Sequence, residues 1–285
     1  MSVLESAHRF TARACLRLWP FPFAHLRLMR LLGASPPKQE YYVSGLRGFP
    51  LRLKFEPQSY IGHSLYFRGM YEEQVVGKLA SLLKPGMTFL DVGANIGLHT
   101  TVAAHRVGPT GRVLAIEPQQ GPLNLLQQNI ALNGLKNVTV VKCGLGATEG
   151  TMELFQLSKT NSGMATLAAS AREHAVGSET VDVKRLTTIA AQTGIDKIDA
   201  VKIDVEGAEM EVLLGADDFL SHHRPAFMLI ECVDKYLARF GASSAGLVEY
   251  LRNRGYDITA LHRGRWEPVQ SADGLAADIL AVRRG

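Results

Sequence analysis

Short apolar runs alternate with helical stretches along most of the sequence, and this alternation restricts the fold more than any other feature. The first runs cover residues 87–92, 112–117, 138–143, 198–204 and 226–232. Each run has the length and the Val, Ile and Leu content of a buried strand, and the stretches between most of them repeat apolar residues at helical spacing. Strands joined by crossover helices form a mostly parallel sheet with helices on both faces. We therefore expect an α/β domain.

The last two apolar runs, residues 256–261 and 278–283, are joined differently. The stretch between them is rich in turn residues and has no helical pattern. Strands that lack a crossover helix pair as antiparallel neighbours. We expect these two runs to form an antiparallel pair at one edge of the sheet.

The N-terminal part of the chain does not follow the alternation. Residues 1–40 read as a basic helical extension, and residues 41–69 read as a β-hairpin-like lead-in to a domain over residues 70–285. Residues 1–55 contain nine Lys or Arg and two Asp or Glu. Such an arm would associate weakly with a membrane surface, although its prolines interrupt any continuous amphipathic face. We favour an arm that packs on the main domain.

Charge and cysteine content exclude several classes of protein. Lys and Arg number 31 and Asp and Glu number 27, and this net charge of +4 does not indicate a nucleic-acid partner. Three widely spaced cysteines form neither a disulfide framework nor a metal-binding pair. Arginines interrupt the apolar N-terminal stretch, so we expect no transmembrane helix. A cytoplasmic location, with peripheral membrane association as the alternative, fits these observations.

A loop with two glycines follows the first apolar run and opens a helix. Its residues are FLDVGANIG, from Phe89 to Gly97. Glycine permits sharp turns and close approach, and Asn95 is of a type that tolerates positive φ. In open α/β sheets such a loop binds a ligand at the carboxyl ends of the strands. The cofactor-binding candidates here are Asp91, Gly93, Ala94, Asn95 and Gly97.

Two acids near this loop indicate the kind of cofactor. Glu117 ends the second run, where its carboxylate could accept hydrogen bonds from both ribose hydroxyls. The alternative role for Glu117 is to cap the helix after Pro118, and we favour ribose binding. Asp91 is unfavourable beside a pyrophosphate but suits the amino or sulfonium group of S-adenosylmethionine. Charge thus favours S-adenosylmethionine over NAD.

The most specific string in the chain is KIDVEGAEMEVLLGA, which begins at Lys202. With FLDVGANIGLHT, AIEP and LIEC, in that order, it resembles the FkbM family of S-adenosylmethionine-dependent methyltransferases over roughly residues 70–260. The resemblance implies a class I, Rossmann-like fold with a seven-stranded sheet. It also implies methylation of oxygen on sugars, polyketides or other secondary metabolites. The residues it assigns to the cofactor pocket are Asp91, Gly93, Asn95, Gly97 and Glu117.

The catalytic candidates are Asp204, Glu206 and Glu231, which follow or end the fourth and fifth runs. A hydroxyl acceptor is barely ionised at neutral pH, so we expect Asp204 or Glu206 to act as general base. Asp204 is also expected at the methionine end of the cofactor. Alternatively, the three carboxylates share Mg²⁺ or Mn²⁺. We favour the interpretation without a metal ion.

Two rival functions stay open for this sequence. One is a nicotinamide-linked oxidoreductase on a similar sheet, which is disfavoured because the glycine spacing is wrong and no hydride-transfer constellation is visible. The other is a non-catalytic cofactor-binding module. The expected partner is a small hydroxylated acceptor, such as a sugar or glycolipid, and the sequence does not predict an oligomeric state.

Overall fold

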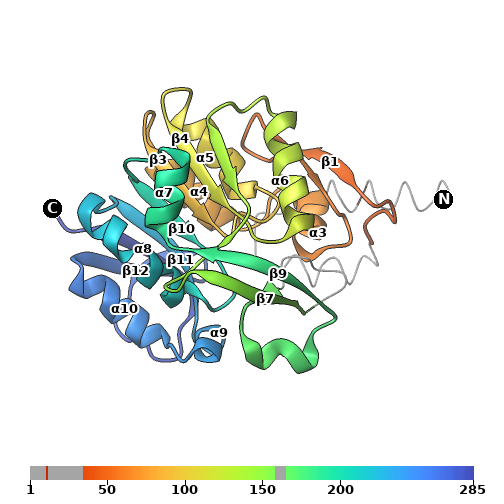
Figure 1. Cartoon of the computed structure of the whole chain (residues 1–285). Helices are drawn as coiled ribbons and strands as arrows, with labels where there is room; N and C mark the ends of the chain where they lie inside the picture. The colour runs from red at the N-terminus through yellow and green to blue at the C-terminus, as the bar shows by residue number, and fades with distance from the viewer. Residues whose placement is uncertain (1–10, 12–34, 158–164) are drawn as a thin grey trace. The chain divides into compact units, whose positions relative to one another are not determined.

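The computed structural model describes residue 11 and residues 35–157 and 165–285, which fall into two compact units (Figure 1). The first unit ends at Glu73 and the second begins at Gln74. Most of the predicted basic extension over residues 1–40 lies outside the described residues. Residues 35–40 are described and contain no helix, since Pro36 and Pro37 disfavour one.

The first unit contains a hairpin and a helix. Strands β1 (Tyr42–Gly45) and β2 (Arg52–Phe55) pair antiparallel. The expectation of hairpin structure through residue 69 is wrong in its second half, because α3 (Tyr60–Arg68) occupies it. Ser59 caps this helix by accepting a hydrogen bond from the Gly62 N–H at 3.0 Å, and such a serine cap is a helix-start signal.

The second unit is built on an eight-stranded sheet with the order β13-β12-β14-β11-β10-β3-β4-β5. The parallel strands are β11, β10, β3, β4 and β5, whereas β14 runs antiparallel to β11 and to β12. The strands are β3 (Thr88–Val92), β4 (Arg112–Ile116), β5 (Val138–Val141), β10 (Ala200–Ile203), β11 (Phe227–Val233), β12 (Tyr256–His262), β13 (Arg265–Pro268) and β14 (Ala276–Arg283).

Two sequence predictions about this sheet can be compared with its topology. The antiparallel pairing of the last two apolar runs is confirmed by β12 and β14. The expected count of seven strands is too small, because β13 adds an eighth at the edge. Arg263 and Gly264 both have positive φ, as in the tight turns that favour hairpins, and so they fold β13 back onto β12.

Helices cover both faces of the sheet, as the alternation predicts. Alternate strand residues point to opposite faces. Phe89 and Val113 share a core cluster with α4 and α5, whereas Leu90 and Leu114 share one with α7, α8 and α10. The helices of this unit are α4 (Glu73–Leu82), α5 (Leu98–Val107), α6 (Gln120–Leu132), α7 (Leu186–Thr193), α8 (Glu209–His223), α9 (Asp234–Leu237) and α10 (Ser244–Asn253).

A small second sheet, which the sequence does not predict, has the order β6-β9-β7-β8. Its strands are β6 (Gly144–Leu145), β7 (Gly150–Gln156), β8 (Ala165–Thr166) and β9 (Gly177–Lys184). Two short 3₁₀ helices, η1 (Ala169–His174) and η2 (Ala238–Phe240), complete the unit. The second sheet brings the Thr166 hydroxyl to 3.3 Å from the Glu206 carbonyl oxygen, beside the carboxyl ends of the main strands.

The strand order reverses beside β3, and such a reversal marks a candidate ligand site. Along the chain, β4 and β5 extend the sheet on one side of β3, and β10 and β11 extend it on the other. Open α/β sheets bind ligands at such a switch point, outside the carboxyl ends of the strands.

No helix in the described part of the chain is long and apolar enough to cross a membrane.

Candidate functional site

The glycine loop after β3 has the backbone conformation that its residue types suggest. Gly93 has a φ of 80°, and a Cβ built there would lie 1.8 Å from the Asp204 carbonyl oxygen, so only glycine fits. Asn95 has a φ of 51°, and Gly97, with a φ of 87°, lies close to Leu126 of α6. The N–H groups of Gly93 and Ala94 both donate to the Ile116 carbonyl at 3.0 Å. These contacts fix the loop between β4 and β10.

Asp91 is a buried carboxylate at the end of β3. Only 1% of its surface is exposed. The Thr100 hydroxyl donates to its Oδ2 at 2.5 Å, while its Oδ1 is buried with no hydrogen-bond partner among the described residues. Burial raises the pKa of Asp91, and the Lys202 ammonium and the Thr100 hydroxyl partly oppose that rise. An incoming cation would supply the missing partner for this oxygen.

Glu117, which follows β4, holds the loop and the start of α6 together. Its Oε2 accepts the Asn95 N–H and its Oε1 accepts the Gln119 N–H, both at 2.8 Å. Burial raises the pKa of Glu117 to about 7, although these two hydrogen bonds lower it. Each carboxylate oxygen can accept a further hydrogen bond. The capping contact and the ribose-binding prediction are therefore compatible.

A buried lysine lies among the acids at the ends of β10 and β11. The Nζ of Lys202 is 2.7 Å from the Oδ2 of Asp204, and their side chains are 3% and 28% exposed. Glu231 of β11 pairs in register with Asp278 of β14. Burial raises the pKa of both acids and the nearby Asp204 charge adds to the rise, whereas the Lys202 ammonium opposes it. Lys202 thus stabilises negative charge in this group.

The turn after β10 carries Glu206 and is held in place by Glu209. Glu206 has a φ of 55°, and burial, followed by the Asp204 charge, raises its pKa to about 7. The Oε1 of Glu209 accepts the N–H groups of Gly207 and Val205 at 3.0 and 3.3 Å. Glu209 is 1% exposed, and burial raises its pKa to about 7.

The structure brings the predicted acids together at one edge of the sheet. Charge interactions link Asp91 with Asp204 and with Glu117, and Asp204 with Glu206 and Glu231. We call this group, with the buried lysine, the carboxylate cluster. Its members are Asp91, Glu117, Lys202, Asp204, Glu206, Glu209, Glu231 and Asp278.

Sequence reasoning missed part of this cluster, namely Lys202, Glu209 and Asp278, and it also missed Thr100. A lysine inside the apolar strand AVKI was the available signal, because a buried ammonium needs a carboxylate partner.

Within residues 35–157 and 165–285 no group of three or more His, Cys, Asp or Glu side chains is arranged to hold a metal ion.

The raised pKa of Glu117 predicts how stability depends on pH. A glutamate has an ordinary pKa near 4.5, and that of Glu117 is about 7 in the folded chain. Between these values the folded state holds a proton that the unfolded state has released, so the contribution of Glu117 to stability falls as pH rises. Relative to wild type, Glu117→Gln should therefore gain about 3 kcal/mol of unfolding free energy between about pH 4.5 and pH 8.

Urea unfolding of both proteins across that range measures this change. Any cost of presenting an amide to the backbone N–H groups does not depend on pH, so it drops out of the difference. Other groups, such as His99, whose pKa burial lowers, titrate in both proteins and also cancel. A difference between the two proteins that stays constant with pH would show that Glu117 is ionised throughout.

Comparisons with known proteins bear on this site. A family model described as "Methyltransferase FkbM domain" matches residues 91–258, a range that begins at Asp91 and includes the glycine loop, β10 and β11. "Methyltransferase sdnD" of Sordaria araneosa is 31% identical over 209 residues, which cover 64% of this chain and 77% of that protein. "31-O-demethyl-FK506 methyltransferase FkbM" of Streptomyces tacrolimicus is 31% identical over 162 residues, covering 48% and 62%.

The crystal structure of "Methyltransferase FkbM from Methylobacillus flagellatus KT" superposes with a TM-score of 0.44 at 18% identity, covering 78% of this chain and 54% of that one.

Proposed function

Because the chain belongs to the FkbM methyltransferase family, we propose that it transfers a methyl group from S-adenosylmethionine to a hydroxyl of a small acceptor such as a sugar, a glycolipid or a secondary metabolite. The observation that carries this proposal is Asp91, whose buried Oδ1 has no hydrogen-bond partner among the described residues. It lies at the switch point of the sheet, beside the glycine loop. A cationic, nucleoside-bearing ligand fits that charge and that position.

The residues of the site divide between the two ends of the cofactor. Asp91 would accept from the amino group of the methionine part, and Glu117 would accept from the ribose hydroxyls. The wall of the pocket between the methionine part and the ribose would be shaped by the glycine loop, through Gly93, Ala94, Asn95 and Gly97. When bound, S-adenosylmethionine supplies a methyl group made electrophilic by the sulfonium charge.

Oxygen as the methyl acceptor is supported by a relative and by the acids of the carboxylate cluster. The name of the Streptomyces tacrolimicus relative specifies the 31-O position of its substrate. A hydroxyl must lose its proton as the new C–O bond forms, so an oxygen acceptor needs a base near the reacting atoms. The carboxylate cluster offers several acids from which that base can come.

Glu206 is the best general base among them. A pKa of about 7 makes a carboxylate an effective proton acceptor near neutral pH. Glu117 and Glu209 also have a pKa of about 7, but their carboxylates accept backbone N–H groups and hold the two turns in place. Asp204 is ion-paired with Lys202, and the pKa of Glu231 is raised so far that its carboxyl holds a proton at neutral pH. In the proposed step Glu206 takes the hydroxyl proton while the acceptor oxygen bonds to the methyl carbon and the methyl–sulfur bond breaks.

Substitution of Glu206 tests this role. Glu206→Gln should lower kcat by about a hundredfold or more, because general-base catalysis contributes that much. In wild type, the rate should rise with pH as Glu206 loses its proton around pH 7, and the variant should lack this rise. Glu211→Gln, a similar change in the first turn of α8, serves as control and should stay within about twofold of wild type. An unchanged pH profile in Glu206→Gln would assign the base to another residue.

Incubation with S-adenosylmethionine that carries a labelled methyl group, together with a panel of hydroxylated sugars, glycolipids and secondary metabolites, tests the function itself. O-methylation is supported if the labelled product is stable to base. The product should also fail to form when the acceptor hydroxyl is blocked. Cofactor binding without any incorporation would favour a binding module, and an absorbance change with NAD would favour an oxidoreductase. Loss of incorporation after EDTA treatment, restored by Mg²⁺ or Mn²⁺, would favour the metal-dependent alternative.

A further inference from the structure

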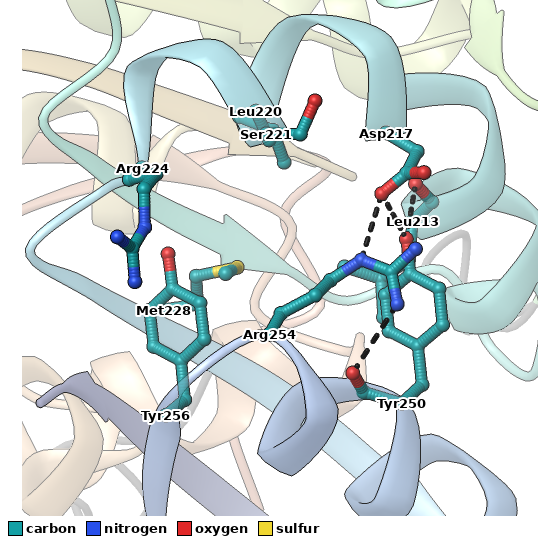
Figure 2. Close-up of a pocket in the computed structure, with 9 residues that line it drawn as sticks. All are labelled: Leu213, Asp217, Leu220, Ser221, Arg224, Met228, Tyr250, Arg254 and Tyr256. Carbon is teal, nitrogen blue, oxygen red and sulfur yellow. Dashed lines mark hydrogen bonds and ion pairs between the residues drawn. The ribbon is translucent and has the colours of Figure 1, made fainter.

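A second pocket lies at the opposite end of α8 from the carboxylate cluster. Its volume is about 170 Å³. It is lined by buried, largely apolar side chains from three elements (Figure 2). These are Leu213 and Leu220 of α8, Met228 near the start of β11, and Tyr256 at the start of β12. A protein cavity of about 150 Å³ is large enough to hold benzene. The pocket can therefore hold one six-membered ring.

The acid at the rim of this pocket is already neutralised. Asp217 accepts from the Nε of Arg254 and from the hydroxyl of Tyr250, both at 2.8 Å. The Arg254 guanidinium also stacks on the Tyr250 ring, with its carbon 3.4 Å from the ring centre (Figure 2). Because these contacts hold Asp217, its carboxylate is not available to the other charged residue of the rim.

That other residue is Arg224, which follows α8. It has a φ of 44°, a conformation that usually belongs to glycine at a helix end. Its backbone is fixed on both sides, since its N–H donates to Leu220 at 2.7 Å and its carbonyl accepts from Arg283 at 2.6 Å. In the described part of the chain no carboxylate pairs with its guanidinium, and Figure 2 shows this side chain beside Tyr256 and Met228 with no dashed contact.

We propose that this pocket binds a small carboxylic acid with one ring, which places the ring against Leu213, Leu220 and Met228 and the carboxylate against Arg224. The rim carries two arginines and one aspartate, so its net charge favours an anion. Arginine suits a carboxylate because its planar fork can donate two parallel hydrogen bonds. This site is separate from the methyl-transfer site and does not depend on the proposed function.

Phenylacetate is the probe that tests the proposal, with binding to the full chain measured by ligand-observed NMR and calorimetry. Saturating S-adenosylhomocysteine is present throughout, so that the cofactor site cannot account for the signal. Phenylacetate should bind, and both phenylacetamide, which has no charge, and acetate, which has no ring, should bind at least about tenfold more weakly.

Variants locate the binding. Arg224→Gln should weaken phenylacetate about tenfold, whereas Arg265→Gln, which removes an exposed arginine outside the pocket, should change it less than about twofold. Ser221→Tyr places a ring at the rim without altering the buried lining and should abolish binding while the thermal unfolding midpoint is kept. No binding by wild type, equal binding of phenylacetamide, or full binding by Ser221→Tyr would each overturn the proposal.

Discussion

Replacing Lys202 by methionine is expected to cost about 3 kcal/mol of unfolding free energy near neutral pH, a large effect for one side chain. The Lys202 side chain is 3% exposed and its Nζ is 2.7 Å from the Oδ2 of Asp204. Its ammonium lowers the pKa of Asp91, Glu231 and Asp278. Removing one partner of a buried ion pair leaves its charged neighbours without compensation.

The effect of Lys202→Met should also depend on pH in one direction. Without the ammonium, the pKa values of the neighbouring carboxyls rise further above their unfolded values, so the variant loses more stability than wild type as pH increases. The gap between the two proteins should thus be small near pH 4 and grow toward pH 8. Lys136→Met removes an exposed lysine and serves as the matched control. A gap that does not change with pH would show that Lys202 only packs.

The second large effect is expected on cofactor affinity. Asp91→Asn keeps the size of the side chain but removes the charge, and it should weaken S-adenosylmethionine binding about a hundredfold, or ~3 kcal/mol. Burial raises the pKa of Asp91, so its ionised form is costly in the folded chain. The variant should therefore be at least as stable as wild type although it binds the cofactor more weakly.

Calorimetric titration and thermal unfolding of the same samples separate these two outcomes. Thr100→Val, which removes the hydroxyl that donates to Asp91 but keeps the carboxylate, should lose less than about tenfold in affinity. A destabilised Asp91→Asn that binds normally would make Asp91 a structural residue. Binding of NAD by wild type, without binding of S-adenosylmethionine, would contradict the cofactor assignment.

The local patterns of this sequence were sufficient to predict most of the main sheet. The apolar run before Gly93 forms β3, and the segment with helical spacing after Gly97 forms α5. In both segments the spacing of apolar residues in the sequence matches the residues that the fold buries. The same reasoning placed Asp91, Glu117 and Asp204 at one edge, since the carboxyl ends of parallel strands meet there.

Features that depend on distant segments could not be read in this way. Asp278 lies opposite Glu231 only because β14 pairs with β11 in one particular register. The second sheet pairs β7 with β9 across a long connection, and neither strand indicates its partner by itself. Helix α3 is hard to predict for another reason: its cap, Ser59, is a single helix signal next to a stronger strand pattern.

A crystal structure of the full chain with S-adenosylhomocysteine tests the central claim most directly, because it shows which acids hold each end of the ligand. We expect the ribose hydroxyls within hydrogen-bonding distance of Glu117, the amino group within that distance of the Asp91 Oδ1, and the sulfur facing Glu206. A nucleoside bound away from β3 and β4, or a vacant carboxylate cluster at saturating ligand, would contradict the assignment of this cluster as the cofactor site.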